Sequence, residues 1–160
     1  MSGSNALKDR ALRLLALRDH TEAELAKKLS RHAGADEIRG LLADLKAHGY
    51  LNDQELACRR AVYLRRQKLR GSRRIAQDLQ RLGLDATMIR FALGRLEEEA
   101  PEAASLREVL ISRVARTGDP KCRADLKKLF DYAVRQGYSP SAVRKELGPF
   151  FSGLDEEEAL

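Results

Sequence analysis

Residues 83–93, Gly-Leu-Asp-Ala-Thr-Met-Ile-Arg-Phe-Ala-Leu, recur in pattern as residues 137–147, Gly-Tyr-Ser-Pro-Ser-Ala-Val-Arg-Lys-Glu-Leu. Both stretches begin with a glycine, continue with a bulky residue and a short polar one, and then carry aliphatic residues at the same two offsets. A glycine just past a helix end can adopt the left-handed conformation, and the polar side chain can cap the next helix. The sequence therefore predicts the same boundary between two helices at two places in the chain.

The repetition extends beyond this boundary and has a period of about 50 residues. Leu25 and Leu29 correspond to Ile75 and Leu79. Apolar residues spaced three and four apart predict helices throughout, and we find no clear alternating pattern of a strand. We expect an all-α protein of three tandem three-helix repeats. The predicted boundaries are residues 5–50, 51–99 and 101–148, followed by an acidic, flexible tail at residues 149–160.

Each predicted repeat is too small to bury a large core alone, so neighbouring repeats should share their apolar faces. Stacking of this kind predicts an elongated, curved array with a concave side. A repeat that folds back on another is the alternative, and the sequence does not decide between the two arrangements.

Local signals mark several helix ends. Thr21 and Glu24 have the spacing of a capping box, in which each side chain accepts a hydrogen bond from the other's backbone. Ser72 and Asp85 have the short polar side chains of N-caps. The pair Gly148-Pro149 is typical of a helix end, which predicts that the last helix stops there.

Composition excludes several classes of protein. The 160 residues carry a net charge of +6 and contain no run of about 18 apolar residues that could span a bilayer. The first residues lack the apolar core of a secretory signal. Cys58 and Cys122 are far apart, and the three histidines lack partners at ligand spacing, so we expect no disulfide framework and no metal. We expect a cytoplasmic monomer that does not bind membranes.

Catalytic motifs are also missing from the sequence. We find neither a glycine-rich phosphate loop nor a nucleophile elbow, and most carboxylates are mixed with cations, as on solvated helix surfaces. The sequence therefore predicts a binding protein, without enzymatic activity and without a cofactor.

The clearest functional candidate is residues 59–74, which we call the basic segment. Residues 51–96 hold 11 basic and 4 acidic side chains, and the basic segment holds eight cations and no acid. Its candidate binding residues are Arg59, Tyr63, Arg65, Arg66, Lys68, Arg70, Arg73 and Arg74. Basic residues of the third repeat, Arg135 among them, alternate with acidic ones and are expected on a salt-bridged surface.

Two interpretations of the basic segment compete. One is a solvated surface that keeps the protein soluble. The other is a docking surface for a nucleic-acid backbone or an acidic protein groove, because the planar fork of arginine fits phosphates and carboxylates. Ordinary solvated surfaces mix both signs of charge, which favours docking.

Several stretches of the sequence resemble a known protein family. Residues 18–29, Arg-Asp-His-Thr-Glu-Ala-Glu-Leu-Ala-Lys-Lys-Leu, resemble the opening signature of the RecX family. Residues 48–53, His-Gly-Tyr-Leu-Asn-Asp, resemble the family's junction between its first and second repeats. The pattern Gly71-x-x-x-Ile75-x-x-x-Leu79 and residues 135–139, Arg-Gln-Gly-Tyr-Ser, resemble its marks in the second and third repeats. The similarity covers roughly residues 8–148, in the family's order.

The resemblance implies a small bacterial negative regulator of the RecA recombinase, with roles in recombination, DNA repair and the SOS response. It implies binding in the groove of the RecA–DNA filament, where the protein blocks extension or promotes disassembly. ATP hydrolysis, strand exchange and coprotease activity would then be inhibited. Gln136 departs from the family pattern, in which many members carry arginine, so support for a basic site in the third repeat is weaker.

The alternative is a stand-alone DNA-binding helical protein that contacts single-stranded and double-stranded DNA weakly and without specificity. The expected third helix, residues 36–48, offers Arg39 and Lys46 among acidic residues, so we do not expect specific base readout. The acidic tail either frays or covers the basic segment as an internal competitor.

Overall fold

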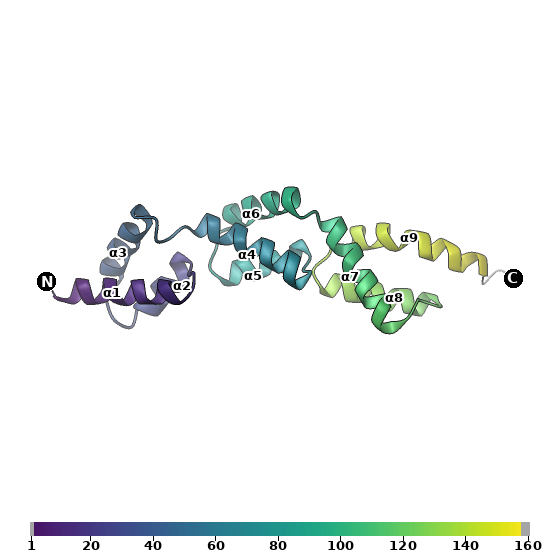
Figure 1. Cartoon of the computed structure of the whole chain (residues 1–160), viewed down its shortest axis with the longest axis horizontal. Helices are drawn as coiled ribbons and strands as arrows, with labels where there is room; N and C mark the ends of the chain where they lie inside the picture. Colours follow the sequence, from purple (N-terminus) through teal and green to yellow (C-terminus); the bar gives the residue numbers. More distant parts are fainter. Residues whose placement is uncertain (1, 158–160) are drawn as a thin grey trace. The chain divides into compact units, whose positions relative to one another are not determined.

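A computed structural model of the protein describes the backbone of residues 2–157 and the side chains of residues 5–149. Within these residues every regular element is a helix (Figure 1), which confirms the prediction of an all-α fold. The helices are α1 (Ser2–Leu17), α2 (Glu22–Leu29), α3 (Ala35–Ala47), α4 (Asp53–Lys68), α5 (Ser72–Arg81), α6 (Ala86–Glu99), α7 (Glu102–Thr117), α8 (Arg123–Arg135) and α9 (Pro140–Glu157). No helix in the described part of the chain is long and apolar enough to cross a bilayer.

The helices follow the predicted repeats in order, three to a repeat, but the chain packs into two compact units with other boundaries. Unit 1 consists of the residues up to Arg60 together with Asp78–Ala92. Unit 2 consists of Ala61–Gln77 together with the residues from Leu93 onward. The middle repeat therefore contributes to both units. The elongated, curved array stays a prediction.

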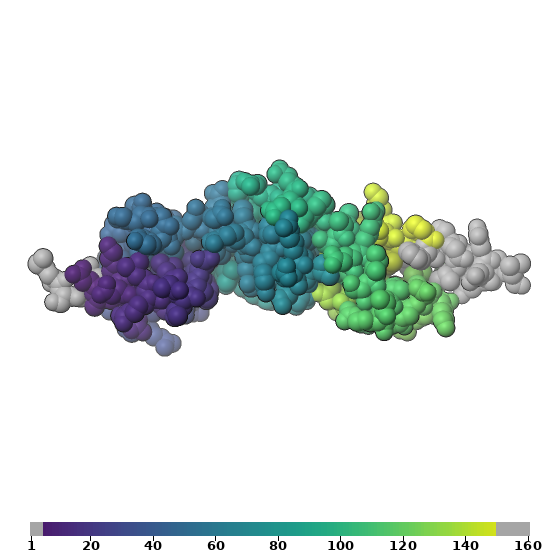
Figure 2. Space-filling view, in the orientation of Figure 1, coloured from purple at the N-terminus to yellow at the C-terminus, as the bar shows by residue number. Residues whose placement is uncertain are grey.

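Each unit has its own apolar core. In unit 1 the buried cluster is Leu7, Ala11, Leu25, Leu29, Ile38, Leu41, Leu42, Leu45 and Leu51. In unit 2 it is Leu106, Val109, Leu110, Leu126, Leu129, Ala133, Tyr138, Val143 and Leu147. Figure 2 shows the side chains of α7 and α8, in green, lying against one another. Burial of each leucine, isoleucine or valine side chain stabilises its unit by about 1.5–3 kcal/mol.

The predicted helix starts at Thr21 and Asp85 are confirmed, whereas the one at Ser72 is not. The Thr21 hydroxyl group accepts from the N–H of Glu24 at 3.1 Å, and the Glu24 carboxylate accepts from the N–H of Thr21 at 3.3 Å. Asp85 caps α6, because its carboxylate accepts from the N–H groups two and three residues further on, both at 2.8 Å. The N-cap prediction for Ser72 is wrong, because α5 begins at Ser72 itself and the carbonyl of Gly71 accepts the first helical hydrogen bonds. The Ser72 hydroxyl group accepts from the guanidinium of Arg65 at 2.8 Å.

The prediction that Gly148-Pro149 ends the last helix is also wrong. α9 continues to Glu157 with Pro149 in its interior. Proline lacks a backbone N–H, so α9 continues past this position with one intrahelical hydrogen bond fewer. Residues 149–157 of the predicted flexible tail are therefore helical, and residues 158–160 lie outside the described part of the chain.

In unit 2 the turn between α4 and α5 lies directly on the turn between α8 and α9. The N–H of Gly71 donates to the carbonyl of Gln136 at 2.9 Å, and the N–H of Arg73 donates to the carbonyl of Gly137 at 3.1 Å. A Cβ on Gly71 would lie 2.2 Å from the carbonyl carbon of Gly137, and a Cβ on Gly137 would lie 2.5 Å from that of Arg74. We call this contact the unit 2 joint. Only glycine fits at these two positions without a displacement of the backbone.

A buried polar network stabilises the unit 2 joint. The hydroxyl group of the fully buried Tyr138 donates to the carbonyl of Leu69 at 3.1 Å. Arg65 is also fully buried, and besides its bond to Ser72 it lies 3.8 Å from the carboxylate of Glu102. That carboxylate accepts from the N–H of Ser72 at 2.9 Å, so one acidic side chain serves both groups.

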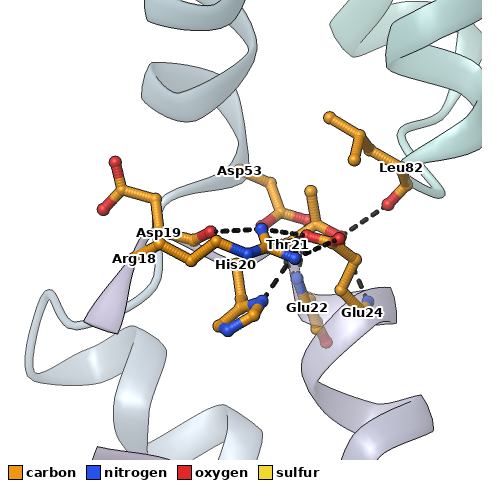
Figure 3. Close-up of polar contacts among 8 residues, drawn as sticks. All are labelled: Arg18, Asp19, His20, Thr21, Glu22, Glu24, Asp53 and Leu82. Atoms are coloured by element: carbon orange, nitrogen blue, oxygen red, sulfur yellow. Dashed lines mark hydrogen bonds and ion pairs between the residues drawn. The ribbon is translucent and has the colours of Figure 1, made fainter. Parts of the chain in front are cut away.

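Unit 1 contains an equivalent contact between the α1–α2 turn and the α5–α6 turn (Figure 3). The Thr21 hydroxyl group donates to the carbonyl of Leu82 at 2.5 Å. Gly83 has φ +83°, and a Cβ there would lie 2.4 Å from that of Ala23. In both units a glycine that follows the second helix of one repeat meets the first turn of the second helix of the preceding repeat. We call the contact in unit 1 the unit 1 joint.

Substitution of Gly137 tests the unit 2 joint. Gly137→Ala places a methyl group 2.5 Å from the Arg74 Cβ at a backbone φ of +99°, so we expect the free energy of unfolding to fall by about 2 kcal/mol or more. Gly94→Ala is the matched control, because Gly94 is helical and no atom lies within 4 Å of its added Cβ. That variant should gain about 0.5–1 kcal/mol from helix propensity. Urea unfolding followed by circular dichroism measures the free energy of unfolding of both variants. Equal values for the two variants would contradict the close contact at Gly137.

Alkaline pH tests the burial of Tyr138. Burial raises the pKa of its phenol to about 12, although the nearby Arg65 opposes this. Because the unfolded phenol ionises near pH 10, the stability that this group contributes is complete below pH 10 and is lost as the pH rises to 12. At pH 11 the wild type should lose about 1–2 kcal/mol more than Tyr138→Phe does, relative to pH 8. At pH 8 the variant should be about 1 kcal/mol less stable. Urea unfolding measures these free energies. If the wild type and Tyr138→Phe lost the same free energy of unfolding between pH 8 and pH 11, the burial of the Tyr138 phenol would be contradicted.

Candidate functional site

The basic segment covers the second half of α4, the α4–α5 turn and the first turn of α5. The boundary between the two units passes through it, so Arg59 belongs to unit 1 and the other candidate residues belong to unit 2. The guanidinium of Arg59 lies 3.1 Å from Asp19 and 3.9 Å from Glu55. These carboxylates offset its charge within unit 1.

Arg65 requires a correction, because it is not on the surface. Its side chain is only 1% exposed and contacts Ser72 and Glu102 inside unit 2, so it offers almost no surface to a partner. The sequence contains a signal for this position. Ala57 and Ala61 are buried and precede Arg65 at intervals of four residues, which places all three on one face of α4.

The remaining candidates surround the α4–α5 turn of unit 2, and we call them the basic surface. Tyr63, Arg66, Lys68 and Arg73 are exposed, whereas Arg70 and Arg74 are half-buried. The basic surface thus consists of Tyr63, Arg66, Lys68, Arg70, Arg73 and Arg74.

Three of these arginines contact other parts of unit 2. Arg66 forms an ion pair with Glu99 at 2.9 Å. Arg70 donates to the side-chain carbonyl of Gln136, and Arg74 donates to the backbone carbonyl of Arg135 at 3.0 Å. Lys68 and Arg73 differ from them, because their side chains have neither an ion pair nor a hydrogen bond within the described residues. These two cations are the most available to an anionic partner.

One further arginine, Arg135, lies beside the basic surface. It was expected on a mixed, salt-bridged surface, but the structure places this exposed residue at the end of α8, where its backbone carbonyl contacts Arg74. The two residues are 61 positions apart, so no local pattern connects them. The Arg-Gln-Gly-Tyr-Ser motif at residues 135–139 marks the turn but does not show which helix it meets.

A second polar cluster surrounds the unit 1 joint (Figure 3). Arg18 pairs with Glu24 at 2.9 Å, and the Asp53 carboxylate accepts from the N–H of Glu22 at 3.0 Å. Nδ1 of the buried His20 lies 3.7 Å from Glu24, too far for a hydrogen bond. Burial and the charge of Arg18 lower the pKa of His20, and burial raises the pKa of Asp53. The carboxylates are engaged by backbone N–H groups and by Arg18, so this cluster stabilises the turn and presents no catalytic arrangement.

Unit 2 also contains a cavity. This cavity, of about 480 Å³ between α7, α8 and α9, is lined mainly by apolar side chains, including Leu110, Val114 and Leu129. Among the described residues, no three histidine, cysteine or carboxylate side chains come close enough to hold a metal ion.

Comparisons with known proteins identify the relatives of this chain. A family model described as "RecX, first three-helix domain" matches residues 8–45. The regulatory protein RecX of Leptothrix cholodnii is 36% identical over 144 residues, which cover 89% of this chain and 87% of that protein. That of Chromobacterium violaceum is 29% identical over 153 residues, which cover 95% and 93%.

Solved structures show the same fold. The crystal structure of RecX from Lactobacillus salivarius superposes with a TM-score of 0.81 at 18% identity, over 96% of this chain and 97% of that one. A second crystal structure of a regulatory protein RecX gives a TM-score of 0.80 at 21% identity, over 92% of this chain and 73% of that one.

A pair of alanine variants tests the different places of Arg65 and Arg66. Arg65→Ala leaves a cavity and removes a buried partner of Glu102, so we expect a loss of about 2–4 kcal/mol in the free energy of unfolding. Arg66→Ala removes an exposed ion pair and should cost less than about 1 kcal/mol. Urea unfolding compares the two neighbours directly. A stable Arg65→Ala variant would show that the buried guanidinium is dispensable.

Proposed function

This chain belongs to the RecX family of regulatory proteins, and from this we propose that it is a negative regulator of RecA that binds the RecA–DNA filament. The observation that carries the proposal is the basic surface of unit 2, which combines exposed cations with few acidic neighbours. Of its cations, only Arg66 has a carboxylate partner within the described residues. A filament of protein on DNA offers the negative charge that such a surface can bind.

The proposed action is mechanical obstruction. Coulomb attraction between the basic surface and the filament increases the association rate, and contacts made by several repeats then lengthen the residence time. A protein lodged in the filament groove blocks the addition of RecA subunits or favours their loss. Inhibition of ATP hydrolysis, strand exchange and coprotease activity follows, because all three need the assembled filament.

A stand-alone, non-specific DNA-binding protein is the second candidate, and the arginines of the basic surface favour it. Arginine contacts to phosphates would supply affinity without sequence preference. Such binding must weaken steeply as the salt concentration rises. The two candidates differ in their effect on RecA at low ratios of regulator to RecA.

The first experiment measures single-stranded-DNA-dependent ATP hydrolysis by the RecA of the same organism during titration with this protein. We expect inhibition at a small fraction of the RecA concentration, because one molecule that stops or dissolves a filament affects many subunits. The charge-reversal variant Lys68→Glu/Arg73→Glu should need about tenfold more protein for the same inhibition.

The matched control is Lys127→Glu/Lys145→Glu, which reverses two exposed cations of α8 and α9 that make no side-chain contact within the described residues. It has the same net charge as the test variant and should inhibit like the wild type. Equal inhibition by both variants would remove the basic surface from the mechanism. Absence of inhibition by the wild type, with salt-sensitive binding to bare DNA, would favour the second candidate.

A further inference from the structure

The unit 2 joint gathers arginines from two repeats around one turn. Arg70, Arg73 and Arg74 come from the α4–α5 turn and the first turn of α5, and Arg135 is the last residue of α8. The backbone of Arg73 bonds to Gly137 at 3.1 Å, and the guanidinium of Arg74 bonds to the carbonyl of Arg135 at 3.0 Å. We call these four residues the arginine cluster.

The arginine cluster has no carboxylate partner among the described residues. Arg70 and Arg74 donate to uncharged carbonyl oxygens, and the side chains of Arg73 and Arg135 are exposed and make no contact there. The C-terminus of α8 supplies only about half a negative charge from its dipole. The backbone contacts of the joint thus bring four arginine residues to one turn, and none of the four has a counter-ion among the described residues, so an anion at this turn would find charge that is not compensated.

The density of charge distinguishes between the two kinds of anionic partner. Arginine is enriched at interfaces between proteins as well, but interfaces with nucleic acids carry much more positive charge in total. Guanidinium groups also bind phosphate oxygens in a bidentate manner. A phosphodiester chain thus matches the arginine cluster better than a protein surface does.

We propose that the arginine cluster is a composite binding site for the phosphodiester backbone of DNA, shared by the second and third repeats and assembled by the unit 2 joint. The proposal rests on the proposed function and names the DNA strand of the filament as the ligand of this part of the basic surface. It adds Arg135, from a repeat with an acidic balance of charge, to the binding residues. It also makes DNA binding depend on a contact between two glycine backbones that carry no charge.

The test is the affinity of the full chain for a fluorescein-labelled oligothymidylate of about six nucleotides, short enough to occupy one site. Arg135→Ala should weaken binding about three- to tenfold and reduce the slope of affinity against salt by about 0.7, one phosphate contact on a single strand. Lys127→Ala is the matched control, since it removes one exposed, uncontacted cation from the same helix, about two turns away. It should bind like the wild type. Equal effects of the two variants would overturn the proposal, because they would show a response to net charge alone.

Gly137→Ala tests the role of the joint without a change of charge. At a temperature where circular dichroism shows this variant to be folded, its affinity for the oligonucleotide should fall at least as far as that of Arg135→Ala. Wild-type affinity of the folded variant would overturn the dependence of the site on the joint.

Two further results separate this proposal from the proposed function. Weaker oligonucleotide binding by Arg135→Ala supports the composite site even if the wild type fails to inhibit RecA, a failure that would remove only the regulatory role. Unchanged oligonucleotide binding by Arg135→Ala, together with weaker binding to RecA in the absence of DNA, would overturn the proposal and make an acidic protein surface the ligand.

Discussion

The contact between the backbones of Gly71 and Gly137 is the constraint on which the arrangement of unit 2 depends. No side chain separates the two turns, and a single methyl group on either glycine would meet backbone or Cβ atoms within 2.5 Å. Two backbone hydrogen bonds fix the register of the turns. Because two backbones in such close contact cannot slide past one another without breaking these bonds, the turn that carries Arg70 and Arg73 has one position on the third repeat. The positions of these arginines therefore depend on the contact between Gly71 and Gly137, which carries no charge itself.

The buried network behind this contact explains how a guanidinium is accommodated in unit 2. Burial of a charge is unfavourable unless partners replace its water. Arg65 has Ser72 as a hydrogen-bond acceptor and Glu102 as a counter-ion at 3.8 Å, while its Nε and Nη1 atoms have no hydrogen-bond partner in the structure. An alternative register of the joint would separate this incompletely satisfied group from both partners, so the buried guanidinium disfavours that register.

The sequence predicts features that depend on neighbouring residues, but it does not predict contacts between residues that are far apart in the chain. The capping box at Thr21 and the cap at Asp85 need only a few neighbouring residues, so both were predictable. Arg65 was assigned to the surface because charge suggested exposure, whereas its spacing from the buried alanines of α4 indicated the core. The contact of Arg135 with Arg74 was not predictable, because the two residues are 61 positions apart and belong to different repeats. Pro149 was predicted to end the last helix because proline disfavours helix interiors. Such a propensity does not show where a helix continues in spite of a proline.

The division of the middle repeat between the two units has a consequence for how this chain can change in evolution. Domain boundaries usually fall in exposed linkers, where a gene can be cut or joined without loss of a core. Here the boundary passes through α4, α5 and α6, and each unit contains a joint whose two turns come from different repeats, so a crossover between repeats would separate the two turns of a joint. A related protein with more or fewer repeats would therefore have to inherit whole joints. Each joint consists of a glycine after the second helix of one repeat and the first turn of the second helix of the preceding repeat. The unit that evolution must keep intact in this fold is therefore the joint between two repeats. The length of the three-helix repeat sets the distance along the sequence from one joint to the next.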